Sequence, residues 1–231
     1  VARHADSNGL DENIAHGNAW RYRDYVVGAF NSDKPFDRFI VEQIAGDLLD
    51  AGSDDQRHEC LVATGFLSIG PKVLAEVNQP KMRMDIVDEQ IDTVGRVFMG
   101  MTFGCARCHD HKFDPIDAAD YYGLAGIFKS TRTMDTYTKV AKWHEFPLKT
   151  AEAATLQAEY DAQLAARKQA IDTCIAQANE AAQASLPDGQ TPPESLETLY
   201  PEAKKAELAD LREELATLKK TPPELPSTMG V

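Results

Sequence analysis

The residue types and spacing best suited to chemistry lie in the segment Cys105-Ala106-Arg107-Cys108-His109. Two thiols separated by two residues can each form a thioether bond to one vinyl group of a haem, and a histidine that follows directly can bind the iron as an axial ligand. The segment therefore predicts covalently bound haem c. Cys105 and Cys108 would be the attachment residues, and His109 would be the proximal iron ligand.

Two other kinds of chemistry are open to the same cluster. Cys105 and Cys108 can form a local disulfide or remain free thiols, or they can bind zinc together with His109 and His111, because zinc accepts mixed thiolate and imidazole ligands. A second CxxC or HxxxH half-site would strengthen the zinc hypothesis, but the sequence contains none. The other cysteines, Cys60 and Cys174, are isolated.

A haem iron has a further axial position, for which methionine and histidine are the usual ligands. Met134 and His144 rank first as distal ligands because they lie downstream, where the chain can return over the haem. The other methionines considered are Met82, Met84, Met99 and Met101. Methionines at helical spacing are more often core residues.

Several polar neighbours of the motif have both a haem-related and a structural interpretation. Arg107 and Lys112 can contact haem propionates or can be solvated charges. Asp110 and Asp114 can orient the imidazole of His109 or can be turn residues. His111 is too close to His109 in the sequence to reach the opposite haem face, so we expect it at the surface or behind the ligand. The pairs Asp47 with Asp50 and Asp85 with Asp88 are expected on solvated helix faces.

Composition restricts the class of protein. The chain has 231 residues, 43% of them hydrophobic, and a net charge of -13. The negative charge argues against nucleic acid as a partner, and it suits a docking surface for a basic redox partner. No apolar run is long enough to cross a bilayer. Neither a signal peptide nor an initiator Met opens the sequence, so we expect a fragment of a longer precursor.

Hydrophobic periodicity predicts a mainly α fold. Apolar residues spaced three and four apart indicate helices over residues 20–30, 36–48, 54–65, 84–101 and 117–128, with loops over residues 1–17 and 66–81. The CxxCH motif then lies on a loop between two helices. We assign residues 1–149 to one helical domain that carries this motif.

The composition changes near residue 150. Residues 151–219 are rich in Ala, Glu, Lys, Leu and Gln, with heptad-like stripes such as Leu208, Leu211, Leu215 and Leu218. A proline-rich turn separates two such stripes at residues 186–193. Residues 150–222 are therefore predicted to form an antiparallel helical hairpin, coiled-coil-like. Residues 223–231 are predicted to be a linker to a following domain.

Several segments resemble a known family of large exported proteins of the planctomycete type. They are ARHADSNG, WRYRDYVVGAFNSDKPFDRFIVEQIAGDLL, ATGF, GRVFMGMTFGCARCHDHKFDPI and DYYGLAGIF, within residues 1–135. In that family a cytochrome c domain often precedes this domain of unknown function, and a second uncharacterised domain follows. The resemblance implies haem at Cys105, Cys108 and His109, a periplasmic or extracellular location, and adjacent domains of the same precursor as partners.

Three functions are compatible with these features. The first is an electron-transfer module carrying haem c within a larger exported redox protein. The second is a haem enzyme acting on peroxide or on a carbohydrate-derived substrate. The third is a non-redox binding or scaffold domain with zinc or a disulfide at the CxxCHxH cluster. No nucleophile elbow, phosphate-binding glycine loop or HExxH motif is present, which disfavours hydrolases and kinases.

Overall fold

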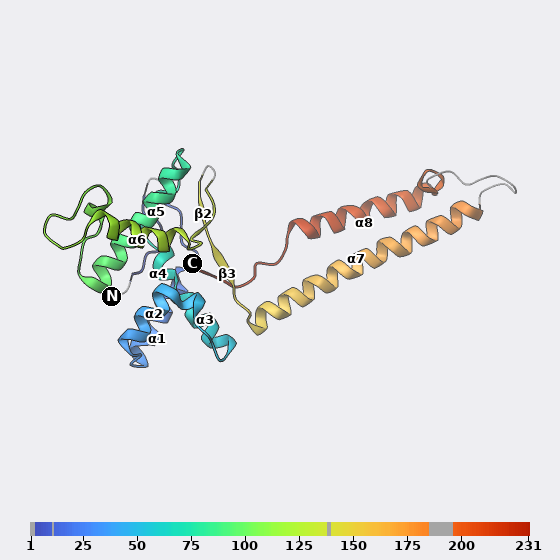
Figure 1. The fold of residues 1–231 in the computed structure, drawn as a ribbon. Coiled ribbons are helices and arrows are strands. Elements are labelled where there is room, and N and C mark those ends of the chain that lie inside the picture. The colour runs from blue at the N-terminus through green and yellow to red at the C-terminus, as the bar shows by residue number, and fades with distance from the viewer. Residues whose placement is uncertain (1–2, 11, 138–139, 185–195) are drawn as a thin grey trace. The chain divides into compact units, whose positions relative to one another are not determined.

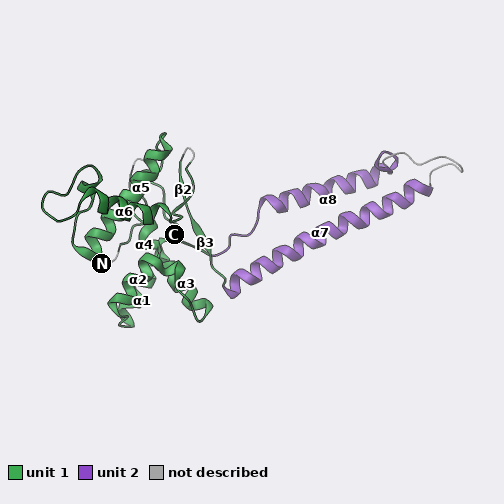
Figure 2. Ribbon diagram, in the orientation of Figure 1, with its two compact units in different colours: residues 1–149, 227–231 green, residues 150–226 purple. Residues whose placement is uncertain are grey.

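The structure is a computed structural model that describes residues 3–10, 12–137, 140–184 and 196–231. The chain divides into two compact units (Figure 2). Unit 1 contains residues 1–149 and 227–231, and unit 2 contains residues 150–226. Among the described residues, no helix combines the length and apolarity that crossing a membrane requires.

Unit 1 is built from helices around one main core, which confirms the mainly α class. The helices are α1 (Ala19–Asn31), α2 (Phe36–Ala45), α3 (Asp54–Ala63), α4 (Gly65–Ser68), α5 (Gln79–Val94) and α6 (Ala118–Lys129) (Figure 1). Side chains that accept hydrogen bonds from the first turn begin three of them, because those backbone N–H groups lack helical partners. These caps are Ser53 for α3, Asn78 for α5 and Asp117 for α6.

The segment before the motif differs from its prediction in two ways. Residues 66–81, expected as a loop, contain most of α4 and the first turn of α5. Helix α5 begins early because Asn78 caps it and Pro80 occupies the first turn, where a missing N–H costs nothing. The helix expected to reach residue 101 is α-helical only to Val94. It continues as a π-helical turn, Gly95–Met99, and stops at Gly100, whose φ of 66° lies in the left-handed region.

Two short antiparallel strand pairs complete unit 1, and helical periodicity gave no indication of them. Strand β1 (Met134–Thr136) pairs with β2 (Lys142–Trp143), and β3 (Glu145–Pro147) pairs with β4 (Ser227–Met229). The assignment of residues 223–231 to a linker is therefore wrong for the last five, which belong to unit 1. Met229 is 1% exposed and Val231 is 4% exposed, so burial of apolar surface holds this segment in the main core.

Unit 2 consists of α7 (Ala151–Ala184), a 3-10 turn (Leu196–Leu199) and α8 (Glu202–Lys220). The Tyr160 hydroxyl donates to the carbonyl of Leu218 at 3.1 Å, and the Tyr200 hydroxyl donates to Asn179 at 2.6 Å. These two contacts mean that α7 and α8 run in opposite directions. Their shared core contains Cys174, Ala178, Ala182, Tyr200 and Leu208. The turn predicted at residues 186–193 lies outside the described residues.

Candidate functional site

The CxxCH motif forms a short 3-10 turn, Gly104–Arg107, followed by Cys108 and His109. The backbone N–H of Cys108 donates to the carbonyl of Cys105 at 3.3 Å, which closes the turn. Ala106 is fully buried in the main core, whereas Cys105, Cys108 and His109 are exposed. The turn therefore presents both free thiols and the imidazole to solvent while its alanine anchors it to the helices beneath.

Arg107 provides a second anchor. Its guanidinium pairs with Asp85 at 2.9 Å and with Asp88 at 3.2 Å, both on α5. Tyr121 of α6 donates its hydroxyl to Asp88 at 2.6 Å. Partial burial opposes ionisation of Asp85, but hydrogen bonds from Lys81 and Arg107 hold the pKa of its carboxyl below the ordinary value. Arg107 is thus paired with two carboxylates of the protein rather than being a solvated charge.

The structural role of Asp85 and Asp88 was missed in the sequence, where they were expected on a solvated face. Their spacing of three residues does place both carboxylates on one face of α5. Periodicity does not predict that Arg107, in a turn about twenty residues later in the chain, forms ion pairs with both carboxylates on this face. A partner at that separation is a tertiary feature.

The imidazole of His109 is oriented by its own loop. Its Nδ1 lies 2.8 Å from the carbonyl oxygen of Asp110. A carbonyl oxygen only accepts hydrogen bonds, so Nδ1 carries the proton and Nε2 keeps its lone pair. This tautomer is the one that binds a metal through Nε2. The Asp110 carboxylate accepts instead from the backbone N–H of Ala118 at 3.0 Å, as a turn residue does.

Both ring nitrogens of His111 contact polar groups of neighbouring residues. Its Nδ1 accepts from the backbone N–H of Asp114 at 2.9 Å and from that of Phe113 at 3.3 Å. Its Nε2 lies 3.4 Å from the hydroxyl of Thr102. To ligate a metal, His111 would have to break the hydrogen bonds that hold residues 111–114 in place.

Met134 and His144, the expected distal ligands, pack against other parts of unit 1. Met134 is 4% exposed and packs in a second core cluster with Leu74, Met82, Ile86 and Ala141. His144 hydrogen-bonds Asp135 at 2.7 Å and its ring packs against that of Phe146. Helix α6, which begins beside the motif and ends before β1, has 12 residues, a length of about 18 Å. Strand β2 and the loop that precedes α6 lie on opposite sides of α5 and α6 (Figure 1).

The remaining methionines divide by burial. Met82 is fully buried, and Met84 and Met101 are partly buried against the main core, as expected of core residues. Met99 is 55% exposed on the π-helical turn. Within the described part of the chain, no three His, Cys, Asp or Glu side chains converge on a point that could hold a metal ion.

The comparisons with known proteins identify the family. The family described as PSCyt2, protein of unknown function (DUF1549), matches residues 1–133, more than half of the 231 residues, and the chain belongs to it. The match covers α1 to α6 and the whole CxxCH turn, and it ends directly before Met134. No curated protein and no solved structure matches the chain.

Proposed function

We propose that Cys105, Cys108 and His109 form an attachment site for haem c, and that the domain is an electron-transfer module of a larger exported redox protein. One observation carries the proposal: all three side chains are exposed on a single turn whose two intervening residues are anchored. Ala106 is fixed by burial and Arg107 by two carboxylates. A turn built in this way keeps two thiols and an imidazole available together.

The surroundings of the turn suit a large apolar cofactor. Phe113 is 83% exposed and Tyr122 is 53% exposed. The Tyr122 hydroxyl donates to the carbonyl of Arg107 at 2.9 Å, and the Phe113 ring stands against that of His111. Apolar groups left in water beside the motif gain free energy when a macrocycle covers them. Bound haem would supply one-electron chemistry, and the protein would supply attachment and axial ligation.

The zinc alternative receives less support from the same loop. A four-ligand site with Cys105 and Cys108 needs both His109 and His111. His111 already uses its ring nitrogens within the loop, so zinc would have to displace those hydrogen bonds.

Location and partners follow from the attachment chemistry. Haem is attached to CxxCH thiols outside the cytoplasm, so we propose a periplasmic or extracellular site of action. A net charge of -13 suits a basic redox partner, and adjacent domains of the precursor are the other proposed electron donors or acceptors.

A second candidate is a haem enzyme that acts on a small oxidant such as peroxide. The observation that favours it is the placement of Met134 and His144 away from the motif, since an unfilled axial position permits chemistry at the iron. A sixth ligand supplied by a neighbouring domain would restore the electron-transfer assignment.

The first prediction tests haem attachment. Protein made in a haem-maturing host should retain its haem after denaturation and acid–acetone extraction, because thioether bonds survive both. The double variant Cys105→Ser with Cys108→Ser should retain none. Cys174→Ser, which changes a free cysteine of unit 2, is the matched control and should behave like the parent.

Two results would count against this proposal. Complete extraction of haem from the parent protein would remove the covalent attachment, and a colourless protein containing stoichiometric zinc would support the scaffold hypothesis. The spectrum of the reduced holoprotein separates the two haem functions. A low-spin iron that binds little carbon monoxide supports electron transfer, and a high-spin iron that binds it rapidly supports the enzyme.

A further inference from the structure

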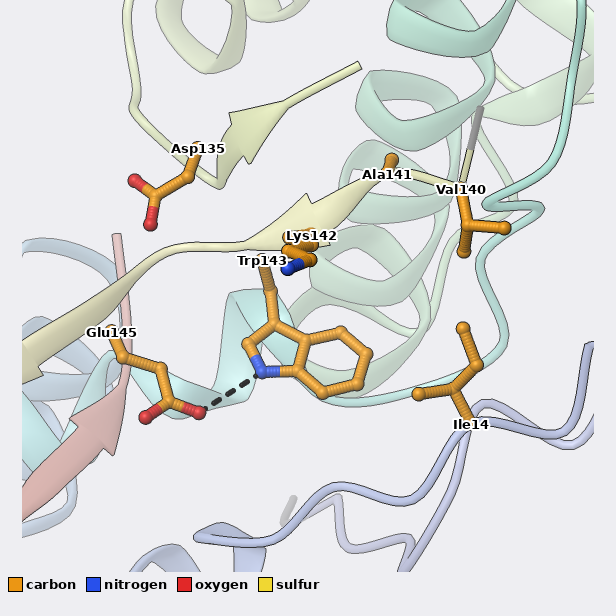
Figure 3. Close-up of a pocket in the computed structure, with 7 residues that line it drawn as sticks. All are labelled: Ile14, Asp135, Val140, Ala141, Lys142, Trp143 and Glu145. Atoms are coloured by element: carbon orange, nitrogen blue, oxygen red, sulfur yellow. Dashed lines mark hydrogen bonds between the residues drawn. The ribbon is translucent and has the colours of Figure 1, made fainter. Parts of the chain in front are cut away.

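Unit 1 contains a pocket that is separate from the CxxCH turn. Its volume is about 440 Å³, within the range of small-molecule sites. Ile14, Val140 and the indole of Trp143 form apolar walls, and the charged residues Asp135, Lys142 and Glu145 also line it (Figure 3). A pocket with this lining can bury an apolar body and place a polar group of the ligand at its edge.

Trp143 is held in place before any ligand arrives. Its Nε1 donates to Glu145 at 3.1 Å, and the ring of His16 packs edge-on against the indole with centroids 4.8 Å apart. His16 is 5% exposed, and burial, with Lys72 and Arg3 nearby, lowers the pKa of its imidazole to about 4. A neutral ring therefore supports the indole, and a fixed aromatic wall loses little entropy when a ligand stacks on it.

The two carboxylates of the pocket are already engaged. Asp135 accepts from His144 at 2.7 Å and from Arg132 at 2.9 Å. Glu145 accepts from Trp143 and, through its other oxygen, from Asn18 at 3.0 Å and from Ser227. Arg132 thus neutralises the charge of Asp135, and neutral donors occupy both oxygens of Glu145.

Lys142 differs from these carboxylates. It is exposed, and its ammonium makes no hydrogen bond or ion pair with any residue of the described ranges. Strand β2 places Lys142 directly before Trp143. Among the described residues that line this pocket, Lys142 is therefore the cationic group still available to a ligand.

We propose that this pocket binds a small planar aromatic carboxylate, with the ring against Trp143 and the carboxylate on the ammonium of Lys142. The apolar walls exclude strongly hydrated ligands, since desolvating polar groups without a partner is costly. The free ammonium selects an anion through a charge-assisted hydrogen bond. This site is independent of haem attachment, because none of its residues belongs to the CxxCH turn.

The second prediction tests this site by calorimetric titration of the full chain with 1-naphthoate and, separately, with the neutral 1-naphthalenemethanol. We expect the carboxylate to bind at one site, with a dissociation constant about tenfold or more below that of the alcohol. Lys142→Met keeps the apolar stem of the side chain, and it should weaken binding of 1-naphthoate by a similar factor. Lys149→Met, which removes an exposed charge outside the pocket, is the matched control and should leave binding unchanged.

Val140→Trp places a large side chain on a pocket wall and should abolish binding of both probes. Equal affinity for the carboxylate and the alcohol in the unaltered protein would overturn the assignment of the anion. Parent-like binding by Val140→Trp would show that the probe binds elsewhere. Absence of saturable binding at millimolar 1-naphthoate would overturn the proposal as a whole.

Discussion

Within the Cys105–His109 turn, burial separates structural residues from chemical ones. Ala106 faces the core and Arg107 is paired with two aspartates, whereas the thiols and the imidazole face solvent. Hydrogen bonds from the loop leave Nε2 of His109 as the free ring nitrogen, and they occupy both nitrogens of His111. Two histidines two residues apart therefore have different capacities as ligands, and backbone hydrogen bonding causes the difference.

The third prediction concerns His16 and pH. Burial lowers its pKa from 6.5 to about 4, so between these values the unfolded chain binds a proton that the folded protein excludes. The unfolding free energy should therefore fall as the pH falls from 6.5 toward 4, by at most about 1.4 kcal/mol per pH unit from this residue. His16→Phe keeps the ring contact with Trp143 and removes the titration. Urea unfolding at pH 7.5, 6.5 and 5.5 measures the difference.

His58→Gln is the control for this experiment. The glutamine amide can still accept the hydrogen bond that His58 accepts from the backbone N–H of Lys149, and since His16 is unchanged, the pH dependence that His16 causes should remain. An unchanged slope between pH 6.5 and 5.5 in His16→Phe would show that another group causes the acid sensitivity.

Among the elements, α5 connects the candidate site to the rest of unit 1. Its residues Asp85 and Asp88 hold the CxxCH turn, and one turn later Glu89 pairs with the buried Lys72 at 2.8 Å and with Arg3. Burial lowers the pKa of the Lys72 ammonium to about 8, although Glu89 acts in the opposite direction. A single acidic helix therefore fixes both the turn and the N-terminal segment.

The end of α5 is shaped by close packing. A Cβ at Gly95 would lie 2.4 Å from the ring of Phe103, closer than two carbon atoms can approach. Phe103 directly precedes the 3-10 turn and is 5% exposed in the main core. Glycine at this position allows the chain to fold back and place the CxxCH turn over the helix.

The fourth prediction concerns β4. Met229 is 1% exposed within the main core, so Met229→Ala should lower the unfolding free energy by about 2–4 kcal/mol through lost burial and a residual cavity. Met99→Ala makes the same chemical change at a side chain that is 55% exposed, and it should cost less than about 0.5 kcal/mol. Urea unfolding of both variants measures the two changes in unfolding free energy. Equal effects would mean that β4 contributes no core burial in solution.

At the scale of the whole molecule, unit 2 is an insertion between two paired strands. Pro147 of β3 is the partner of Ser227 of β4, and unit 2 connects them with residues 150–226. Unit 1 thus contains all of the CxxCH turn, the aromatic pocket and the segment matched by the family. The helices of unit 2 have a core of their own around Cys174 and Leu208.

The fifth prediction follows from this topology. Replacement of residues 150–226 by Asn-Gly leaves a four-residue connection, Leu148-Lys149-Asn-Gly, between the paired residues Pro147 and Ser227. It should leave unit 1 folded, because loops of this length join antiparallel strands. Its thermal midpoint should stay within about 5 °C of the unit 1 transition in the full chain. A chain that ends at Lys149 lacks β4 and should melt at a clearly lower temperature. If both shortened chains melt alike, β4 is not required by unit 1.

The local sequence determined the main helices of unit 1, the CxxCH cluster and the boundary near residue 150. The helical periodicity of residues 20–48 and 84–94 reflects burial on one side of each helix, and the resulting mainly α class is what the structure shows. The CxxCH spacing identified the cluster, and the change in composition near residue 150 marked a different kind of segment. These signals can be found without tertiary information because each arises within a few turns of the chain.

Tertiary structure alone decided the features that join distant segments. The return of Ser227–Met229 to β3 depends on pairing across about eighty residues, and such a short strand has no periodicity of its own. The ion pairs of Arg107 with Asp85 and Asp88 and the pocket between Ile14 and Trp143 likewise join segments that are distant in the sequence. Met134 and His144 were expected over the haem because they lie downstream of the motif, and their surroundings too depend on the tertiary structure. Position along a chain does not determine position in space: α6, about 18 Å long, lies between the motif and the strands that contain or adjoin Met134 and His144.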